Sequence, residues 1–222
     1  RYRIGEVPPP PYYLLNPREF EVELKIPNDI VQIEVYDQSA DLDVTIQKTG
    51  NQQVQGGSQM RYDFSNIANN SNVPLEDFYW HDTIPTNAVT LNAIKTGTYN
   101  ENLTYQIVYR TNKNSTWRVL AGGLNTLQSY DIDCTGSRLG FAWDEYITEF
   151  RFEFGDVGAG FHSTSNPAIL VTVSGRLPNG QQFANRADAG GSYYGKWITS
   201  SYTWVTTVIT PSRPVSYPKT GY

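Results

Sequence analysis

Short segments in which apolar and polar residues alternate recur along most of the chain. Residues 20–26 read Phe-Glu-Val-Glu-Leu-Lys-Ile, and residues 30–36 alternate in the same way after a Pro-Asn-Asp turn. Successive side chains of a β-strand point to opposite faces, so this pattern predicts strands with one buried face, here paired as a β-hairpin. Further strands are predicted over residues 41–48, 59–67, 75–84, 89–94, 103–111, 117–120, 146–154, 168–174, 182–188 and 202–209.

Turn signals separate these segments, among them Pro178-Asn-Gly180 and Gly190-Gly191. Many short strands at regular spacing predict an all-β fold, a β-sandwich. The 16 tyrosines, 9 phenylalanines and 5 tryptophans, against one methionine, also favour strands over helices. Residues 139–145 supply at most one helical turn.

Three stretches are expected along the 222 residues. Residues 1–38 combine a proline-rich lead-in with the hairpin, which we interpret as part of a preceding domain because a two-stranded hairpin is marginal alone. Residues 41–209 form the main sandwich, and residues 210–222, with three prolines and few apolar residues, form a linker.

Charge and residue usage exclude several classes of function. The net charge of −5 and the absence of a basic stretch argue against nucleic-acid binding. The single Cys134 forms no intramolecular disulfide, and with only His81 and His162 a Cys/His zinc site is not supported. No apolar run approaches the roughly 18 residues of a membrane span. We expect no metal and no cofactor.

Three polar residues fall on the apolar faces of predicted strands. They are Lys48, Asp82 and Asn185, on the first, a middle and a late strand of the main domain. A polar group buried without a partner costs about 1–3 kcal/mol, so each must be hydrogen-bonded, functional or modified. Structural roles are open alternatives: Lys48 extending to water at the strand end, Asp82 capping the turn before Pro85, and Asn185 satisfying a bulge or backbone group.

The tail and the body of the chain resemble Gram-positive surface proteins. Tyr217-Pro-Lys-Thr-Gly221 is similar to the Leu-Pro-x-Thr-Gly sorting signal, with Tyr217 where leucine is usual. Residues 41–209 resemble the Ig-like "conserved repeat" domains of cell-wall-anchored proteins, and residues 20–37 resemble the last strands of a collagen-adhesin B-type domain. The first likeness rests on Val44-Thr-Ile-Gln-Lys-Thr-Gly50, Met60-Arg-Tyr-Asp-Phe64, Asn72-Val-Pro-Leu-Glu-Asp-Phe78, His81-Asp-Thr-Ile-Pro85 and Phe183-Ala-Asn-Arg-Ala187, in this order.

The resemblance implies an extracellular, cell-wall-anchored stalk or adhesin whose tail residues Tyr217, Pro218, Lys219, Thr220 and Gly221 are read by a sortase. Domains of this family often carry an isopeptide bond between a lysine on the first strand and an asparagine on the last, assisted by a buried acid. The resemblance therefore implies a bond between Lys48 and Asn185 with Asp82 as the acid. Other candidates for the acid are Glu76, Asp77 and Glu149.

Other functions remain open beside the monomeric, non-enzymatic stalk that we expect. A ligand-binding module would use aromatic residues for a carbohydrate, host or matrix protein; the candidates are Tyr193, Tyr194, Trp197, Tyr202 and Trp204. A hydrolase using His81, Asp82 and a serine is a distant third, since no Gly-x-Ser-x-Gly elbow is present. The acids Asp131, Asp133, Asp144 and Glu145 lack the spacing of a calcium loop.

Overall fold

The computed structural model describes residues 1–5, 13–14, 19–26, 30–34, 36 and 38–210. Its elements are β1 (Tyr2–Ile4), β2 (Tyr13–Leu14), β3 (Phe20–Val22), β4 (Gln38–Ser39), β5 (Val44–Gly50), β6 (Gln53–Gln55), β7 (Gln59–Asn69), β8 (Leu75–Thr83), β9 (Val89–Lys95), β10 (Thr98–Tyr99), β11 (Thr104–Thr111), β12 (Asn114–Asn125), β13 (Asp131–Asp133), α1 (Gly136–Leu139), β14 (Ile147–Val157), β15 (Ser163–Ser165), β16 (Ala168–Val173), β17 (Gln182–Tyr193) and β18 (Lys196–Ile209).

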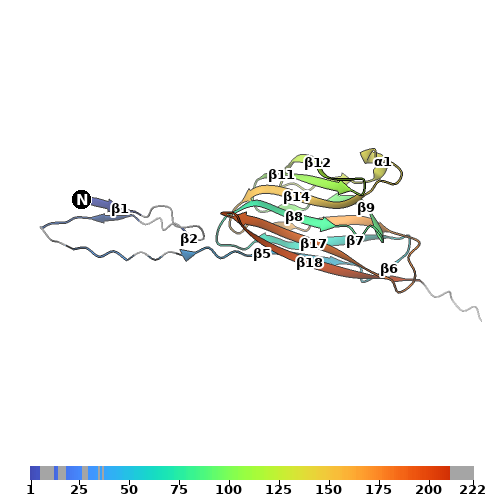
Figure 1. The fold of residues 1–222 in the computed structure, drawn as a ribbon, viewed down its shortest axis with the longest axis horizontal. Helices are drawn as coiled ribbons and strands as arrows, with labels where there is room; N and C mark the ends of the chain where they lie inside the picture. Colours follow the sequence, from blue (N-terminus) through green and yellow to red (C-terminus); the bar gives the residue numbers. More distant parts are fainter. Residues whose placement is uncertain (6–12, 15–18, 27–29, 35, 37, 211–222) are drawn as a thin grey trace, which may run out of the picture.

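Two sheets form the main body (Figure 1). A seven-stranded sheet has the order β12-β11-β14-β8-β17-β18-β6, and a five-stranded sheet has the order β13-β9-β16-β7-β5. Neighbouring strands are antiparallel except β18 and β6, which pair in parallel. The prediction of an all-β sandwich is confirmed.

Alternating side chains explain why the two sheets pack together. Along β14, Phe150, Phe152 and Phe154 are buried, while Glu149 and Arg151 face the outside of the sheet and are only half-buried. The inward side chains of both sheets meet in an aromatic core, in which the rings of Trp80 and Phe152 stack with their centroids 4.2 Å apart. This alternation buries apolar area, the main favourable term in folding, at every second position of a strand.

The hairpin of β17 and β18 differs from the sequence prediction. Gly190 and Gly191 lie inside β17 and do not form a turn; the chain reverses at Tyr194-Gly195, whose φ angles are 47° and 76°. Two consecutive left-handed residues are typical of a type I′ turn. Gly190 is needed in the strand because a Cβ there would lie 2.8 Å from the carbonyl oxygen of Ile198. The glycines mark a close approach of neighbouring strands.

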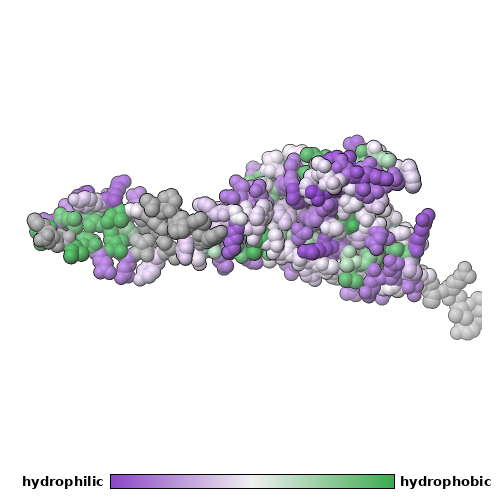
Figure 2. Space-filling model, in the orientation of Figure 1, coloured by the Kyte–Doolittle hydropathy of each residue, from purple (hydrophilic) through white to green (hydrophobic). Residues whose placement is uncertain are grey.

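The predicted hairpin of residues 20–26 with 30–36 is wrong in the described part of the chain. Residues 20–22 form β3, which pairs with β1 in the register Ile4↔Phe20, and residues 23–26, 30–34 and 36 lie outside strands. Alternation defines a face but not a partner strand, and a short isolated hairpin gains too little burial to fix its pairing. Figure 2 shows apolar residues on the surface of this segment, where Ile30 is 89% and Ile26 is 68% exposed.

The helical turn also lies earlier than residues 139–145. α1 covers Gly136–Leu139 and ends at Gly140, whose φ of 69° provides the left-handed cap. In the described ranges, no helix has the length and apolar character needed to cross a bilayer.

Candidate functional site

Lys48, Asp82 and Asn185 meet inside the sandwich, and all three are fully buried. Lys48 lies on β5 of the five-stranded sheet, whereas Asp82 on β8 and Asn185 on β17 belong to the seven-stranded sheet. The Lys48 amine contacts Asp82 Oδ1. The Asn185 side-chain amide donates a hydrogen bond to Asp82 Oδ2 over 3.3 Å. The carboxyl group of Asp82 therefore joins a side chain from each of the two other strands.

Small residues on β17 make room for this cluster. Asp82 is paired across the sheet with Ala187, and Trp80 is paired with Ala189. Both alanines are fully buried, so the bulky or polar side chains of β8 extend over them toward the opposite sheet. Asn185 lies two residues before Ala187, and a diagonal neighbour of this kind is within side-chain reach in an antiparallel pair.

Aromatic rings surround the amine of Lys48. Its Nζ lies 4.7 Å from the centroid of the Tyr62 ring and 4.4 Å from that of Phe64. The Phe64 ring in turn packs against Trp80 with a centroid distance of 4.7 Å. A cation in such surroundings loses its hydration and retains mainly the contacts with the ring faces and with Asp82.

Burial shifts both ionisable groups toward their neutral forms. It lowers the pKa of Lys48 to about 8, against the charge and hydrogen bond of Asp82, which act to raise it. Burial also raises the pKa of Asp82, against the opposing effect of Lys48 and the hydrogen bond from Asn185. A neutral amine beside a protonated carboxylic acid is the state required for amine attack on an amide.

The carbonyl oxygen of Asn185 is the third feature of the site. Asn185 Oδ1 is buried and has no hydrogen-bond partner among the described residues. Such an orphaned acceptor costs about 1–3 kcal/mol in a folded protein and calls for an explanation. The arrangement brings an amine, a carboxylic acid and an amide with an unpaired carbonyl oxygen together in the buried core.

The structural alternatives for these three residues do not match their environment. Lys48 has no exposed surface and so does not extend to water. Asp82 contacts Lys48 and Asn185 inside the core, and the amide of Asn185 is directed at Asp82. The other candidate acids lie elsewhere: Glu76 and Asp77 are exposed, and Glu149 faces the outside of the sheet.

His81 and Asp82 point to opposite faces of β8, so the structure does not bring them together as a catalytic pair. The His81 ring instead lies between two carboxylates, with Nδ1 3.0 Å from Asp188 and Nε2 2.9 Å from Glu149. Trp117 of β12 covers this outer face, where its ring packs on the guanidinium groups of Arg110 and Arg151.

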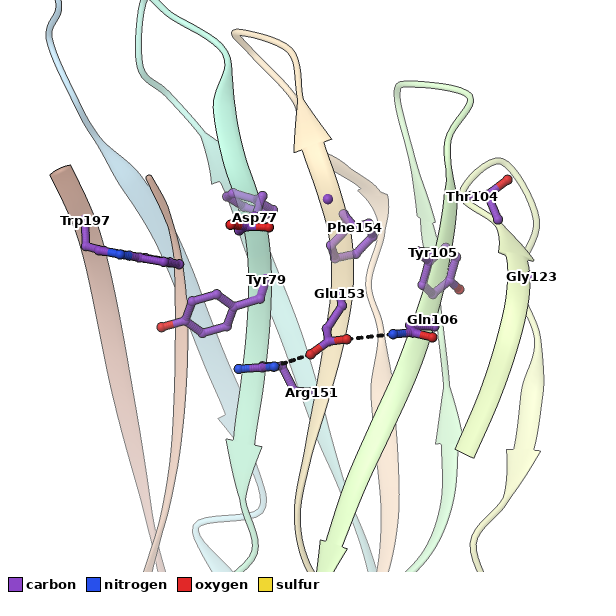
Figure 3. Close-up of a pocket in the computed structure, with 12 residues that line it drawn as sticks. Asp77, Tyr79, Thr104, Tyr105, Gln106, Gly123, Arg151, Glu153, Phe154 and Trp197 are labelled. Carbon is purple, nitrogen blue, oxygen red and sulfur yellow. Dashed lines mark hydrogen bonds and ion pairs between the residues drawn. The ribbon is translucent and has the colours of Figure 1, made fainter. Parts of the chain in front are cut away.

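The five aromatic residues predicted as a binding surface are not one surface. Tyr193 and Tyr194 pack edge to face at the β17–β18 turn, and Trp204 donates from Nε1 to the carbonyl oxygen of Asn51 over 3.3 Å. Tyr202 lines a depression between β18 and the opposite sheet, together with Gln47 and Asn66 among others. Of the five, only Trp197 lines a groove of about 610 Å³ on the outer face of the seven-stranded sheet (Figure 3).

Sequence reasoning missed most of the residues that line this groove. They include Tyr79, Gln106, Arg151 and Glu153 beside Trp197. All four point outward from their strands, whereas the sequence predictions relied on the inward-facing positions of these strands. The signal available was the row of outward aromatic and charged residues at alternate positions of 75–84 and 146–154.

The remaining sequence candidates have structural roles or lie outside the described residues. Cys134 is buried, and burial raises the pKa of its thiol to about 12. Asp144 pairs with Lys113, and Glu145 pairs with Arg118. In the ranges that the structure describes, no three His, Cys, Asp or Glu side chains cluster as a metal site. The sorting-like residues 217–221 fall outside those ranges.

Comparison with known proteins adds little to this site. No protein-family profile and no curated protein sequence matches the chain. Similar solved structures include a collagen-binding domain from a Staphylococcus aureus adhesin, at 14% identity and a TM-score of 0.34, covering 76% of this chain and 99% of that one. Another is AggA, the major subunit of aggregative adherence fimbriae type I from Escherichia coli, at 10% identity and a TM-score of 0.31, covering 76% and 95%. At these TM-scores the likenesses assign no function.

Proposed function

We propose that this chain is a non-enzymatic, load-bearing segment of an extracellular bacterial surface protein, with its two sheets cross-linked by an isopeptide bond between Lys48 and Asn185. The observation that carries the proposal is the buried contact of one carboxyl group, that of Asp82, with both the amine and the amide. Stability in a domain that has a single cysteine cannot come from an internal disulfide, and an amide cross-link would fill that role.

The reaction needs only the three side chains. The neutral amine of Lys48 attacks Cγ of Asn185, so a new carbon–nitrogen bond forms and the bond from Cγ to Nδ2 breaks. Asp82, protonated at the start, donates its proton to the departing Nδ2, which leaves as ammonia, and takes a proton back from the attacking nitrogen. The products are a secondary amide and ammonia, and the carboxyl group of Asp82 is returned to its starting state. The 3.3 Å hydrogen bond from Nδ2 to Asp82 lies along the path of the proton to the leaving group.

The position of the bond gives it a mechanical role. The main body is entered through β5 and left through β18, and these two chain ends lie toward opposite ends of the sandwich (Figure 1). A covalent link from β5 to β17 would carry tension across the domain, so the segment between residues 48 and 185 would bear none of it. By analogy with a disulfide that closes a loop of roughly 100 residues, the link would also stabilise the fold by about 4–5 kcal/mol.

The cellular setting is part of the proposal. The sorting-like residues 217–221 and the resemblance to cell-wall-anchored domains favour attachment to a Gram-positive cell wall by a sortase. In that setting the segment would hold a more distal binding region away from the cell.

Intact mass spectrometry tests the bond directly. The purified chain should be about 17 Da lighter than its sequence, the mass of one ammonia lost in the amine attack. A tryptic digest should contain a branched peptide that joins Lys48 and Asn185. A wild-type chain at the full sequence mass would overturn the cross-link.

A pair of lysine variants links the mass to stability. Lys48→Ala should keep the full sequence mass, because no ammonia is lost. Its free energy of unfolding, measured with denaturant, should fall by about 4 kcal/mol or more, because both the cross-link and buried methylenes are lost. Lys95→Ala is the matched control, since Lys95 is an exposed lysine on β9. It should keep the 17 Da loss, with a stability change within about 0.5 kcal/mol.

A further inference from the structure

The groove of about 610 Å³ on the outer face of the seven-stranded sheet has the composition of a binding site. Its volume falls in the range of roughly 300–1,000 Å³ that small-ligand sites occupy. It crosses the sheet from β11 over β14 and β8 to Trp197 on β18 (Figure 3). It lies on the opposite face of β8 from Asp82, so it is separate from the cluster that carries the proposed cross-link.

Aromatic rings line one end of the groove. Trp197 and Tyr79 lie side by side with their ring centroids 6.4 Å apart, and Trp197 is 55% exposed. The guanidinium of Arg151 lies 5.6 Å from the Tyr79 ring. A large apolar ring kept in water beside polar groups offers a stacking surface to a ligand that has one apolar face.

Hydrogen-bonded polar side chains continue the groove from these rings across β14 to β11. Glu153 accepts a hydrogen bond from Arg151 Nε over 2.9 Å on one oxygen and from Gln106 Nε2 over 2.8 Å on the other. Figure 3 shows these three side chains in a row across the strands, next to the two rings. The mutual hydrogen bonds hold them in place before any ligand arrives, which lowers the ordering cost of binding.

The backbone of the groove is irregular at three of its lining residues. Asp77, Gly123 and Gly155 have φ angles of 52°, 67° and 69°. The pairing of β14 with β8 shifts register between Glu153 and Gly155, opposite Phe78. Bulges and left-handed non-glycine residues are enriched beside binding sites, where they redirect side chains.

Charge and strand pairing narrow the class of ligand. The charged side chains that line the groove are Asp77, Glu153 and Arg151, so an acidic ligand meets more negative than positive charge. The strands β11, β14 and β8 are paired on both sides, which leaves no backbone edge for an extended peptide to join. A sugar ring has an apolar face for stacking and a rim of hydroxyl groups that can bond to Glu153, Gln106 and Arg151.

We propose that this groove binds a short, neutral oligosaccharide, with a sugar ring stacked on Trp197 and its hydroxyl groups held by the row Arg151-Glu153-Gln106. This inference does not rest on the isopeptide bond, and it gives the segment a recognition role in addition to a mechanical one.

Calorimetric titration of the full chain tests the proposal. The probes are soluble neutral oligosaccharides of hexose and N-acetylhexosamine units, acidic oligosaccharides that carry uronate or sulfate groups, and an unrelated peptide pool. At least one neutral oligosaccharide should bind, and Trp197→Ala should weaken its binding about tenfold or more, which corresponds to about 1.4 kcal/mol.

The matched control is Trp143→Ala, because Trp143 is 97% exposed and does not line the groove. This variant should bind as the wild type does, and circular dichroism should show both variants folded. Glu153→Gln should weaken binding, and the variant should still be lighter than its own sequence by the mass of one ammonia. The proposal is overturned if no neutral oligosaccharide binds at millimolar concentration, if only acidic sugars or peptides bind, or if both tryptophan variants bind equally well.

Discussion

The two faces of β8 place acids beside bases whose pKa values are shifted in opposite directions. On the inner face, Asp82 contacts the amine of Lys48, both side chains are fully buried, and burial shifts the pKa of each group toward its neutral form. On the outer face one residue earlier, His81 lies between two carboxylates that are each partly exposed, and its pKa is raised. The same kind of pair is therefore shifted toward its neutral form on one face and toward its charged form on the other.

The difference shows that solvent access, more than residue type, decides what an acid–base pair does. A charge without water is costly, so a buried pair gains by transferring its proton and can then act as nucleophile and acid. A half-exposed pair keeps its charges and contributes modest stability. Strand alternation alone assigns neighbouring residues to these two environments.

The largest effect is expected when the acid of the inner face is removed. Asp82→Ala leaves Lys48 without its partner and removes the proposed proton carrier, so the chain should keep its full mass. It should lose about 4–5 kcal/mol of stability with the cross-link and, in addition, about 3–5 kcal/mol for the broken buried pair. Intact mass and urea unfolding measure the two effects. Asp82→Asn should also keep the full mass, because an amide of similar shape cannot carry the proton.

If either Asp82 variant is lighter than its sequence by about 17 Da, the mass of one ammonia, the bond has formed and Asp82 is not required for it. A smaller effect on stability than that of His81→Gln would reverse the comparison between the two faces.

On the outer face of β8, titration of His81 should make the stability of the fold depend on pH. Burial acts to lower the pKa of His81, but the hydrogen bonds and charges of Asp188 and Glu149 outweigh it, so the folded-state pKa is raised above 6.5. The charged or titratable groups around the His81 ring are Asp188 on β17, Glu149 and Arg151 on β14, and Arg110 on β11.

A group whose pKa is higher in the folded than in the unfolded protein stabilises the fold at pH values below its unfolded-state pKa. This stabilisation is lost as the pH rises through the folded-state pKa. The stability difference between the wild type and His81→Gln should therefore be largest below pH 6.5 and shrink above it. Urea unfolding at a series of pH values measures it. A difference that grows with pH would mean that His81 is buried as the neutral form.

The smallest effect is expected for the ring that covers the outer face. Trp117 lies 4.1 Å from the guanidinium of Arg110 and 4.8 Å from that of Arg151. Trp117→Ala should cost about 1–2 kcal/mol, since each exposed cation–π contact contributes roughly 0.5–1 kcal/mol. This variant should still be lighter than its own sequence by the mass of one ammonia. Loss of the cross-link in this variant would show that the two faces are coupled through β8.

Sequence reasoning worked where a residue's face decides its environment. Alternation at Trp80 and Asp82, and at Phe183 and Asn185, was enough to assign these side chains to the interior, and all four are buried. It failed where the environment of a residue depends on which strand its own strand pairs with. Residues 20–26 alternate well, yet β3 pairs with β1, and Gly190 looked like a turn although it is needed for strand contact.

By itself, the sequence determined the all-β class, the face of each major strand and the presence of three polar side chains among apolar ones, because these follow from a period of two residues. Tertiary structure alone decided that Lys48, Asp82 and Asn185 meet, since they come from three strands in two sheets. It also decided that Trp197 joins Tyr79 and Arg151 in one groove while the other predicted aromatics do not. Strand order and sheet packing depend on long-range contacts, which the local pattern of a chain does not encode.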